Sequence, residues 1–293
     1  MPSLANHQSN EFTKLLLIGD AKSGKTGSLV SLVEAGYKLR ILDMDNLLDI
    51  LKYMVLEKCP DKVGNVEFRT LRDKRKATQE GSVVDGSPRA FIDAIKMFDK
   101  WKYKDAEGNE VDYGVPANWG PECILVVDSL SRLCDAAWDW ADPLTPVGKS
   151  GLKDVRATYG SAQDAIEQLL ATLTSPNFNT NVIVIAHISY MEIGGSEDPE
   201  TGKIVGGILK GFPQGIGQKL SPKIAQYFPS VVLFNNEGGK RTIQTNSTPL
   251  IDLANPKPFA MAKKLPLDTG LATFFETLRG PNKEAPKVVA RRA

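Results

Sequence analysis

Residues 14–26 read KLLLIGDAKSGKT, and this stretch combines two patterns that decide the fold. Lys14–Gly19 is a short apolar run that ends in glycine, which is typical of a strand buried inside a parallel sheet. Gly19–Thr26 matches the pattern G-x-x-x-x-G-K-[ST] at every fixed position. Residues 24–35 then have the pattern of a helix, and Gly36 suits its C-terminal end. The stretch therefore predicts a strand, a glycine-containing loop and a helix in direct succession.

The loop has the residue types that bind the phosphates of a nucleotide. Its glycines allow backbone N–H groups to turn toward a phosphate, and the helix that follows adds the positive end of its dipole. Lys25 is expected to reach the β- and γ-phosphate oxygens, and the Thr26 hydroxyl is expected to ligate Mg²⁺. The sequence therefore predicts a site for a nucleoside triphosphate and Mg²⁺. Its nucleotide-binding residues are expected to be Gly19, Asp20, Ala21, Lys22, Ser23, Gly24, Lys25, Thr26 and Gly27.

Apolar runs further along the chain continue the alternation of strands and helices. Predicted strands cover residues 14–19, 38–43, 66–71, 124–127, 181–186, 231–234, 241–245 and 250–253. Predicted helices cover residues 24–35, 46–57, 88–101, 161–173 and 271–278. A hairpin is expected at 103–113, and a long loop rich in glycine and proline at 189–222. This order predicts an α/β fold with a mostly parallel central sheet flanked by helices, and the late strands are expected to form an antiparallel edge.

The length of 293 residues fits about two domains or one enlarged α/β domain. The motifs favour a single domain over residues 13–279. Residues 1–12 are polar and lack periodicity, so they are expected to form a flexible arm. Residues 280–293 contain proline, lysine and arginine and are expected to be a disordered basic tail. Hydrophobic residues make up 42% of the chain and charged residues 24%, which excludes a wholly disordered or fibrous protein.

Composition also limits the possible compartments and partners. No run approaches the roughly 18 apolar residues of a membrane-spanning helix, and the N-terminal residues lack the basic and apolar regions of a secretory signal. Cys59, Cys123 and Cys134 lie far apart and are predicted to be reduced thiols rather than a zinc site. The chain has 36 Lys and Arg against 35 Asp and Glu, for a net charge of +1. Binding to nucleic acid would therefore require a local basic patch or many copies in an assembly.

Carboxylates follow two of the predicted strands. Asp128 ends the run ILVVD, which is the position expected for an acid that holds the water shell of the metal ion. Asp43 and Asp45 follow the strand at 38–43, and a carboxylate there could orient the attacking water. Asp45 is preferred because it lies further past the strand end. The alternative is that these two residues cap the helix that starts near Asn46.

His187 directly follows the predicted strand at 181–186. A polar residue at the carboxyl end of a central strand lies on the ligand side of an open α/β sheet. There it could form a hydrogen bond with the γ-phosphate or the attacking water and signal hydrolysis to the loop that follows. The alternative is a core histidine whose hydrogen bonds are satisfied within the protein.

Four segments, GDAKSGKT, RILDMDN, ILVVDSLSRL and NVIVIAHIS, occur in an order and spacing that resemble RecA-fold P-loop ATPases. The chain is most similar to the phage-encoded, AAA-like nucleotide-binding ATPases that share the RecA core. The resemblance implies that Lys25, Asp45 and His187 are catalytic, with Asp45 as the base and His187 as the sensor. It also implies that Thr26 and Asp128 bind the metal. RecA itself has a glutamate as the base and an amide side chain as the sensor, so the chain departs from it at both positions.

The resemblance further implies an ATP-hydrolysing enzyme that acts in phage DNA recombination, repair or single-strand annealing. It implies assembly on single-stranded DNA as a ring or filament, and a single-strand-binding protein is a further possible partner. The location implied is the cytoplasm of an infected bacterial host, without a membrane. Residues 189–218 would face the DNA, the basic run at 69–76 is a second candidate for this contact, and Lys240–Arg241 would reach the nucleotide of a neighbouring subunit.

Two other functions are compatible with the loop motif. The first is a nucleotide or small-molecule kinase, although residues 189–222 have no arginine that could act in a lid over the phosphates. The second is a nucleotide-gated structural assembly protein that retains the site without turnover. Stimulation of ATP hydrolysis by single-stranded DNA would separate these alternatives from the DNA-processing ATPase.

Overall fold

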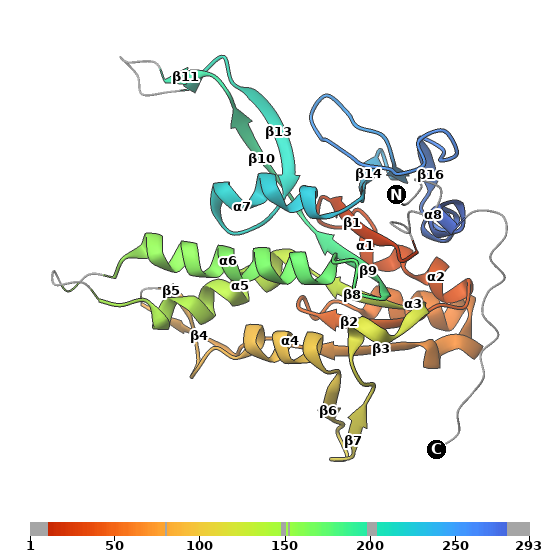
Figure 1. Ribbon diagram of the computed structural model, residues 1–293, viewed down its shortest axis with the longest axis horizontal. Coiled ribbons are helices and arrows are strands. Elements are labelled where there is room, and N and C mark those ends of the chain that lie inside the picture. Colours follow the sequence, from red (N-terminus) through yellow and green to blue (C-terminus); the bar gives the residue numbers. More distant parts are fainter. Residues whose placement is uncertain (1–10, 80, 148–150, 152, 198–203, 280–293) are drawn as a thin grey trace, which may run out of the picture.

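The computed structural model describes residues 11–279, except 80, 148–150, 152 and 198–203. An eight-stranded sheet with the order β16-β15-β14-β1-β9-β8-β2-β3 forms the centre of the fold (Figure 1). All pairs from β14 to β3 are parallel, whereas β15 and β16 add to the edge of β14 in antiparallel orientation. The predicted α/β fold, with a mostly parallel sheet and late antiparallel strands, is confirmed.

The bounds of the elements follow the sequence patterns at most positions. The main sheet contains β1 (Lys14–Gly19), β2 (Lys38–Asp43), β3 (Val66–Thr70), β8 (Gly120–Asp128), β9 (Thr180–Ala186), β14 (Ser230–Glu237), β15 (Lys240–Gln244) and β16 (Lys264–Pro266). The helices are α1 (Lys25–Ser28), α2 (Val30–Glu34), α3 (Asp49–Lys58), α4 (Ala90–Asp99), α5 (Leu130–Ala141), α6 (Val155–Leu173), α7 (Gly217–Ile224) and α8 (Gly270–Arg279). Within the described residues, four two-stranded pairs lie outside the main sheet. They join β4 (Arg75–Thr78) with β5 (Gly81–Val84), β6 (Lys102–Lys104) with β7 (Glu110–Asp112), β10 (Ile188–Ile193) with β13 (Ile208–Pro213), and β11 (Ser196–Glu197) with β12 (Ile204–Val205).

Helices cover both faces of the sheet, which explains why its central strands are apolar without alternation. Along β1, Leu16 and Ile18 belong to a core cluster that contains residues of α4, α5, α6 and α7. Leu15 and Leu17 belong to a second cluster, which contains residues of α2, α3 and α8. All four side chains are fully buried. Hydrophobic burial on both faces therefore holds β1 rigid and fixes the point at which the phosphate loop begins.

The prediction of a long loop at 189–222 is wrong. The segment contains a two-stranded ribbon, β10 and β13, which projects away from the sheet, and the helix α7 follows it (Figure 1). Glycine and proline in this segment suggested a loop, but Gly211 lies within β13. A Cβ atom at Gly211 would lie 3.0 Å from the side chains of Tyr190 and Ile251, so this glycine permits close packing at the base of the ribbon.

The sequence patterns also missed α5, the hairpin of β4 and β5, and the strand β16. Helix α6 begins at Val155 rather than at 161, because the Asp154 carboxylate accepts a hydrogen bond from the Arg156 N–H at 3.0 Å and caps the helix. The predicted strand at 250–253 is wrong, since these residues form no strand and the isolated bridge to Val231 is made by the next residue, Ala254. The expected arm at 1–12 and the expected tail at 280–293 lie almost entirely outside the described residues, so they stay predictions.

Across the described ranges, no helix is both long enough and apolar enough to cross a membrane.

Candidate nucleotide-binding site

Four adjacent parallel strands bring the predicted site residues to one edge of the sheet. The strands β1, β9, β8 and β2 are neighbours in this order, and their carboxyl ends all lie at that edge. Gly19 ends β1, His187 follows β9, Asp128 ends β8 and Asp43 ends β2. Because β9 lies between β1 and β8, His187 is placed between the phosphate loop and Asp128. The strand order, rather than sequence proximity, assembles this site.

The phosphate loop depends on glycine at two positions. A Cβ atom at Gly19 would lie 2.8 Å from both the Phe234 carbonyl oxygen and the Ser23 hydroxyl, so a larger residue would displace the loop. Gly24 has a φ of 100°, in the left-handed region that favours glycine, and it immediately precedes α1. Sterically, the loop can take this path only with the glycines of the motif.

Lys25 is buried beneath the loop. Its Nζ donates hydrogen bonds to the carbonyl oxygens of Gly19 at 2.7 Å and Asp20 at 2.8 Å, and to the Ser23 hydroxyl at 3.3 Å. Burial lowers the pKa of Lys25 to about 8, although Asp128 and other nearby carboxylates partly oppose this shift. The ammonium group is thus held against the loop from within the protein, where an anionic ligand would raise its pKa again.

Thr26 and Asp128 meet across the edge of the sheet. The Thr26 hydroxyl donates a hydrogen bond to Asp128 Oδ2 at 2.7 Å, although the two residues are 102 positions apart in sequence. Burial raises the pKa of Asp128 to about 7, and the hydrogen bond from Thr26 opposes this effect only in part. The raised pKa shows that the positive charge near this buried carboxyl group is too small to favour its ionised form. A divalent cation would supply that charge.

A magnesium ion fits this donor set. Mg²⁺ in phosphate-loop sites is held by one hydroxyl, a nearby acid and oxygens of the nucleotide and of water, rather than by a cage of protein side chains. Thr26 and Asp128 provide the hydroxyl and the acid. The described residues contain no group of three or more His, Cys, Asp or Glu side chains that could hold a metal.

Asp43 and Asp45 occupy different environments. Asp43 is buried, and its carboxylate accepts hydrogen bonds from the N–H groups of Asp45 at 3.2 Å and Asn46 at 2.7 Å and from the Thr70 hydroxyl at 2.8 Å. These contacts give Asp43 a structural role in the turn after β2. The alternative in which both residues cap the helix does not apply to α3, which starts at Asp49 after an N-cap residue without a side-chain hydrogen bond.

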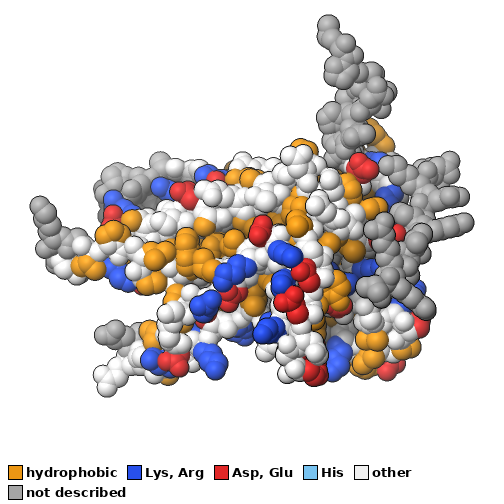
Figure 2. Space-filling model, turned by 60° about the horizontal axis from the view of Figure 1, so that its bottom comes forward, with side chains coloured by type: hydrophobic (Ala, Val, Ile, Leu, Met, Phe, Trp, Pro, Cys, Tyr) orange, Lys and Arg blue, Asp and Glu red, His pale blue; other side chains and the backbone are white. Residues whose placement is uncertain are grey.

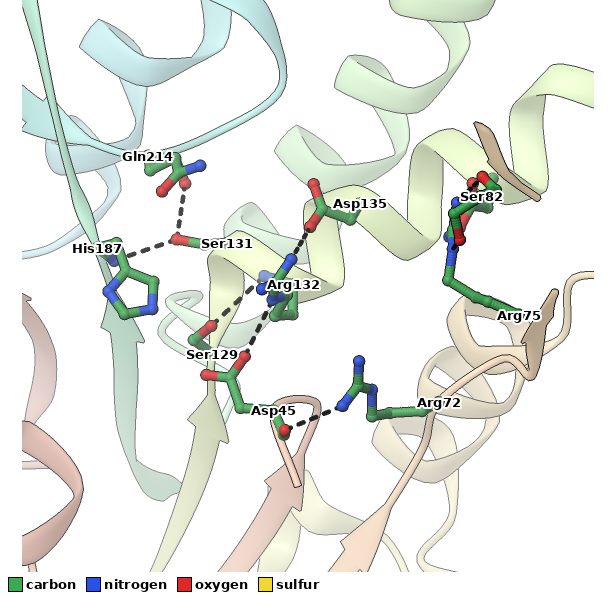
Figure 3. Close-up of polar contacts among 11 residues, drawn as sticks. Asp45, Arg72, Arg75, Ser82, Ser129, Ser131, Arg132, Asp135, His187 and Gln214 are labelled. Atoms are coloured by element: carbon green, nitrogen blue, oxygen red, sulfur yellow. Dashed lines mark hydrogen bonds and ion pairs between the residues drawn. The ribbon is translucent and has the colours of Figure 1, made fainter. Parts of the chain in front are cut away.

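The Asp45 carboxylate extends toward the Arg132 side chain on α5 (Figure 3). Arg132 Nε lies 3.4 Å from Asp45 Oδ1, and Arg132 Nη1 lies 3.0 Å from Asp135 Oδ2. On the other side, Arg72 Nη1 donates a hydrogen bond to the Asp45 carbonyl oxygen at 3.3 Å. The charge of Asp45 also acts on both Lys25 and His187, so the three predicted catalytic residues share one electrostatic environment.

His187 lies at the junction between β9 and the ribbon. Burial lowers the pKa of His187, and the positive charge of Lys25 adds to this effect, so the neutral imidazole is favoured. The backbone of His187 is fixed by Ser131, which sequence reasoning did not select. The Ser131 hydroxyl accepts a hydrogen bond from the His187 N–H at 3.1 Å and donates one to the Gln214 carbonyl oxygen at 3.2 Å (Figure 3). Gln214 N–H in turn donates to the His187 carbonyl oxygen at 2.8 Å.

Ser131 thus ties both ends of the ribbon to the first turn of α5, directly after Asp128. Ser131 and Arg132 both lie in the run SLSR that follows Asp128. Because helix α5 was not predicted there, the sequence did not show that their side chains lie near the site. A helix was predictable from the N-cap Ser129, whose hydroxyl accepts a hydrogen bond from the Arg132 N–H, and from the apolar residues that follow at helical spacing.

Two other candidate segments have well-defined positions. A Cβ atom at Gly24 would lie 3.4 Å from Arg241 Cδ, so Arg241 lies beside the phosphate loop of its own chain. Most of the basic run at 69–76 makes contacts within the chain, since Arg75 pairs with Asp139 at 2.6 Å and Lys76 pairs with Asp85 at 3.1 Å. Figure 2 likewise shows basic and acidic side chains next to each other on this face, rather than a patch of one sign. A DNA contact at 69–76 stays a prediction.

The strand order and the phosphate loop define a P-loop nucleotide-binding protein. A family model described as AAA domain matches residues 11–255, and the chain belongs to this family. The family is one of P-loop ATPases, and membership implies the use of a nucleotide, usually with Mg²⁺. Among curated proteins, no significant match to this chain was found.

Proposed function

We propose that this protein hydrolyses ATP with Mg²⁺ and uses the cycle to act on single-stranded DNA, in phage recombination, repair or strand annealing. In this proposal Lys25 binds the β- and γ-phosphates, and Thr26 and Asp128 hold the metal ion. Asp45 orients and deprotonates the attacking water, and His187 contacts the γ-phosphate or this water. The hydrogen bond between Thr26 and Asp128 carries the proposal, because it joins the phosphate loop to the acid at the end of β8.

The distribution of charge supports the assignment of roles. The neutral imidazole of His187 can accept or donate a hydrogen bond without adding a second positive charge next to Lys25. Asp45 is partly shielded, with 13% of its side chain exposed, so a water molecule can reach its carboxylate while bulk solvent is limited. Asp43 is excluded from this role because its carboxylate is occupied by three hydrogen bonds.

The ribbon supports the coupling to DNA. Strand β10 starts directly after His187, and β13 ends directly before Gln214. The backbones of both residues are hydrogen-bonded to the Ser131 hydroxyl on α5. A shift of His187 toward a bound γ-phosphate would therefore move the base of the ribbon. Ordering or moving a surface segment through contacts with a γ-phosphate is an established type of nucleotide switch.

Exposed apolar residues next to the site support self-association. Ile50 and Tyr53 on α3 are 51% and 62% exposed, and Leu56 continues the same stripe. Ile50 is also close to the phosphate loop, since a Cβ atom at Gly27 would lie 3.5 Å from its Cγ1. A second copy of the chain that covered this stripe would lie beside the nucleotide. An assembly would also align many weakly charged subunits along one strand, which a net charge of +1 for each chain requires.

The test measures ATP hydrolysis with and without a single-stranded oligonucleotide. We expect hydrolysis to require Mg²⁺ and to increase when DNA is added, and we expect DNA to bind more tightly in the presence of ATP. Lys25→Ala should abolish binding of a fluorescent ATP analogue, whereas Asp45→Asn should bind it normally and lose turnover. If DNA neither binds nor stimulates hydrolysis, the DNA-processing function is wrong, while the ATPase assignment remains testable by the two variants.

A further inference from the structure

We propose that Arg132 is a positioning residue for hydrolysis, which acts by holding the Asp45 carboxylate in the orientation needed to contact the attacking water. The proposal rests on the proposed role of Asp45 as the base. Arg132 was not among the residues that the sequence motifs selected. Helix α5 places Arg132 at the edge of the sheet that carries the site residues, because the first turn of this helix directly follows Asp128.

Asp45 lies in a segment that provides little orientation of its own. Residues 44–48 connect β2 and α3 without regular secondary structure. The backbone of Asp45 is held on both sides, by the Asp43 carboxylate at its N–H and by Arg72 at its carbonyl oxygen. Its carboxylate is different, because Arg132 is its ion-pair partner among the described residues. The direction in which this carboxylate points therefore depends on Arg132.

Arg132 is itself held in place by a second carboxylate. Its Nε faces Asp45 Oδ1 at 3.4 Å, and its Nη1 faces Asp135 Oδ2 at 3.0 Å (Figure 3). Asp135 is three residues further along α5, so the pair spans about one turn of the helix. A planar guanidinium that contacts two carboxylates with different nitrogens has a defined orientation, which a lysine ammonium cannot reproduce.

The surrounding space explains why this second contact matters. Arg132 and Asp135 line a cavity of about 380 Å³, which is also lined by Arg72, Arg75 and Asp139. The Arg132 side chain is 56% exposed, so it has room to turn away from Asp45. Asp135 opposes this movement. With this ion pair in place, the guanidinium keeps its Nε directed at Asp45.

A structural role for Arg132 predicts a different result from a positioning role. Ion pairs between residues as exposed as these contribute little to the stability of a protein. The loss of Arg132 should therefore leave folding nearly unchanged. Displacement of a catalytic carboxylate by about 1 Å can reduce the turnover rate by about 100-fold. The effect of a substitution should appear in kcat rather than in stability or in the KM for ATP.

The experiment measures Mg²⁺-dependent ATP hydrolysis by the full chain at saturating single-stranded DNA. We expect Arg132→Ala to lower kcat by about 10- to 100-fold and to change the KM for ATP by less than about twofold. Arg132→Lys should recover only part of kcat, and Asp135→Asn should lower it by a few-fold. Arg89→Ala is the matched control and should leave kcat unchanged, because Arg89 is similarly exposed and pairs with Asp93 rather than with Asp45.

A double variant shows whether Arg132 acts through Asp45. If it does, adding Arg132→Ala to Asp45→Asn should lower the residual rate no further. A further loss as large as in the wild-type background would overturn the proposal, as would an unchanged kcat in Arg132→Ala or an increase confined to KM. Arg132→Gln, with a urea unfolding midpoint equal to that of the wild type, provides a second variant should Arg132→Ala fold poorly. If Asp45→Asn retains full turnover, the base assignment fails, and this outcome is distinct from a failure of Arg132 alone.

Discussion

Replacing Asp128 by asparagine should stabilise the nucleotide-free protein while removing its metal-dependent activity. Asp128 is 4% exposed, and burial raises the pKa of its carboxyl from 3.8 to about 7. Because each pKa unit corresponds to about 1.4 kcal/mol, keeping this group ionised in the folded protein costs about 4 kcal/mol above pH 7. Asparagine carries no charge, and its side-chain oxygen can still accept the hydrogen bond from Thr26.

The expected gain is smaller than this full cost. The new amide group places N–H donors where a carboxylate oxygen was, and an unsatisfied buried donor costs about 1–3 kcal/mol. Asp128→Asn should therefore raise the free energy of unfolding by about 1–3 kcal/mol at pH 8. The sign of the pH dependence follows from the raised pKa. The protonated carboxyl imposes no cost below about pH 4, the cost grows as the pH rises to about 7, and it is constant above that value.

Urea unfolding followed by tryptophan fluorescence, at pH 8 and near pH 4, checks this prediction. The variant should be more stable than the wild type at pH 8 and no more stable near pH 4. Asp164→Asn, at an exposed position of α6, is the control and should change stability little at either pH. Addition of Mg²⁺ and ATP should stabilise the wild type but not Asp128→Asn. A variant that is less stable at pH 8, or equally shifted at both pH values, would refute the electrostatic reasoning.

Three further predictions test other parts of the structure. Gly19→Ala should lower the free energy of unfolding by about 1–3 kcal/mol and weaken binding of a fluorescent ATP analogue, because the new Cβ would collide with Phe234. Gly64→Ala is the control and should have neither effect, since nothing lies within 4 Å of a Cβ at that position. Burial lowers the pKa of Lys14 to about 7, so the unfolded chain binds this proton more tightly than the folded chain does. The free energy of unfolding should therefore rise between pH 7 and pH 10, and urea titrations of Lys14→Met should show a smaller rise. Ser131→Ala should reduce the stimulation of ATP hydrolysis by single-stranded DNA at unchanged affinity for the ATP analogue, because it detaches both ends of the ribbon from α5; equal stimulation in the variant would contradict this coupling.

Local patterns were sufficient to predict the phosphate loop and most of the sheet. The loop has a fixed spacing of glycine, lysine and threonine because its backbone must curl around an anion within a few residues. The strands of the central sheet are continuous apolar runs because helices cover both of their faces. Both signals lie within a short stretch of sequence, and neither requires knowledge of distant residues. The same holds for Asp128 and His187, which directly follow such runs.

Elements whose pattern is mixed were harder to predict. The ribbon β10–β13 contains glycine and proline that usually indicate a loop, whereas helix α5 was missed although its N-cap and apolar spacing are those of a helix. The ribbon persists as strands because its two halves pair with each other and its base packs against Ile251, a contact between segments far apart in sequence. Cross-strand pairing of this kind leaves only a weak trace in either segment alone.

The sequence by itself determined that this protein has a phosphate loop, a parallel α/β sheet and acidic residues at the ends of its strands. Only the tertiary structure distinguished the environments of these acids. Asp43 and Asp45 are two residues apart and chemically identical, yet Thr70 and two backbone N–H groups bind Asp43, while Arg132 faces Asp45. Thr70 and Arg132 come from β3 and α5, and the order of the strands brings them to the same edge of the sheet. Roles that depend on such distant neighbours can be assigned only once the chain has folded.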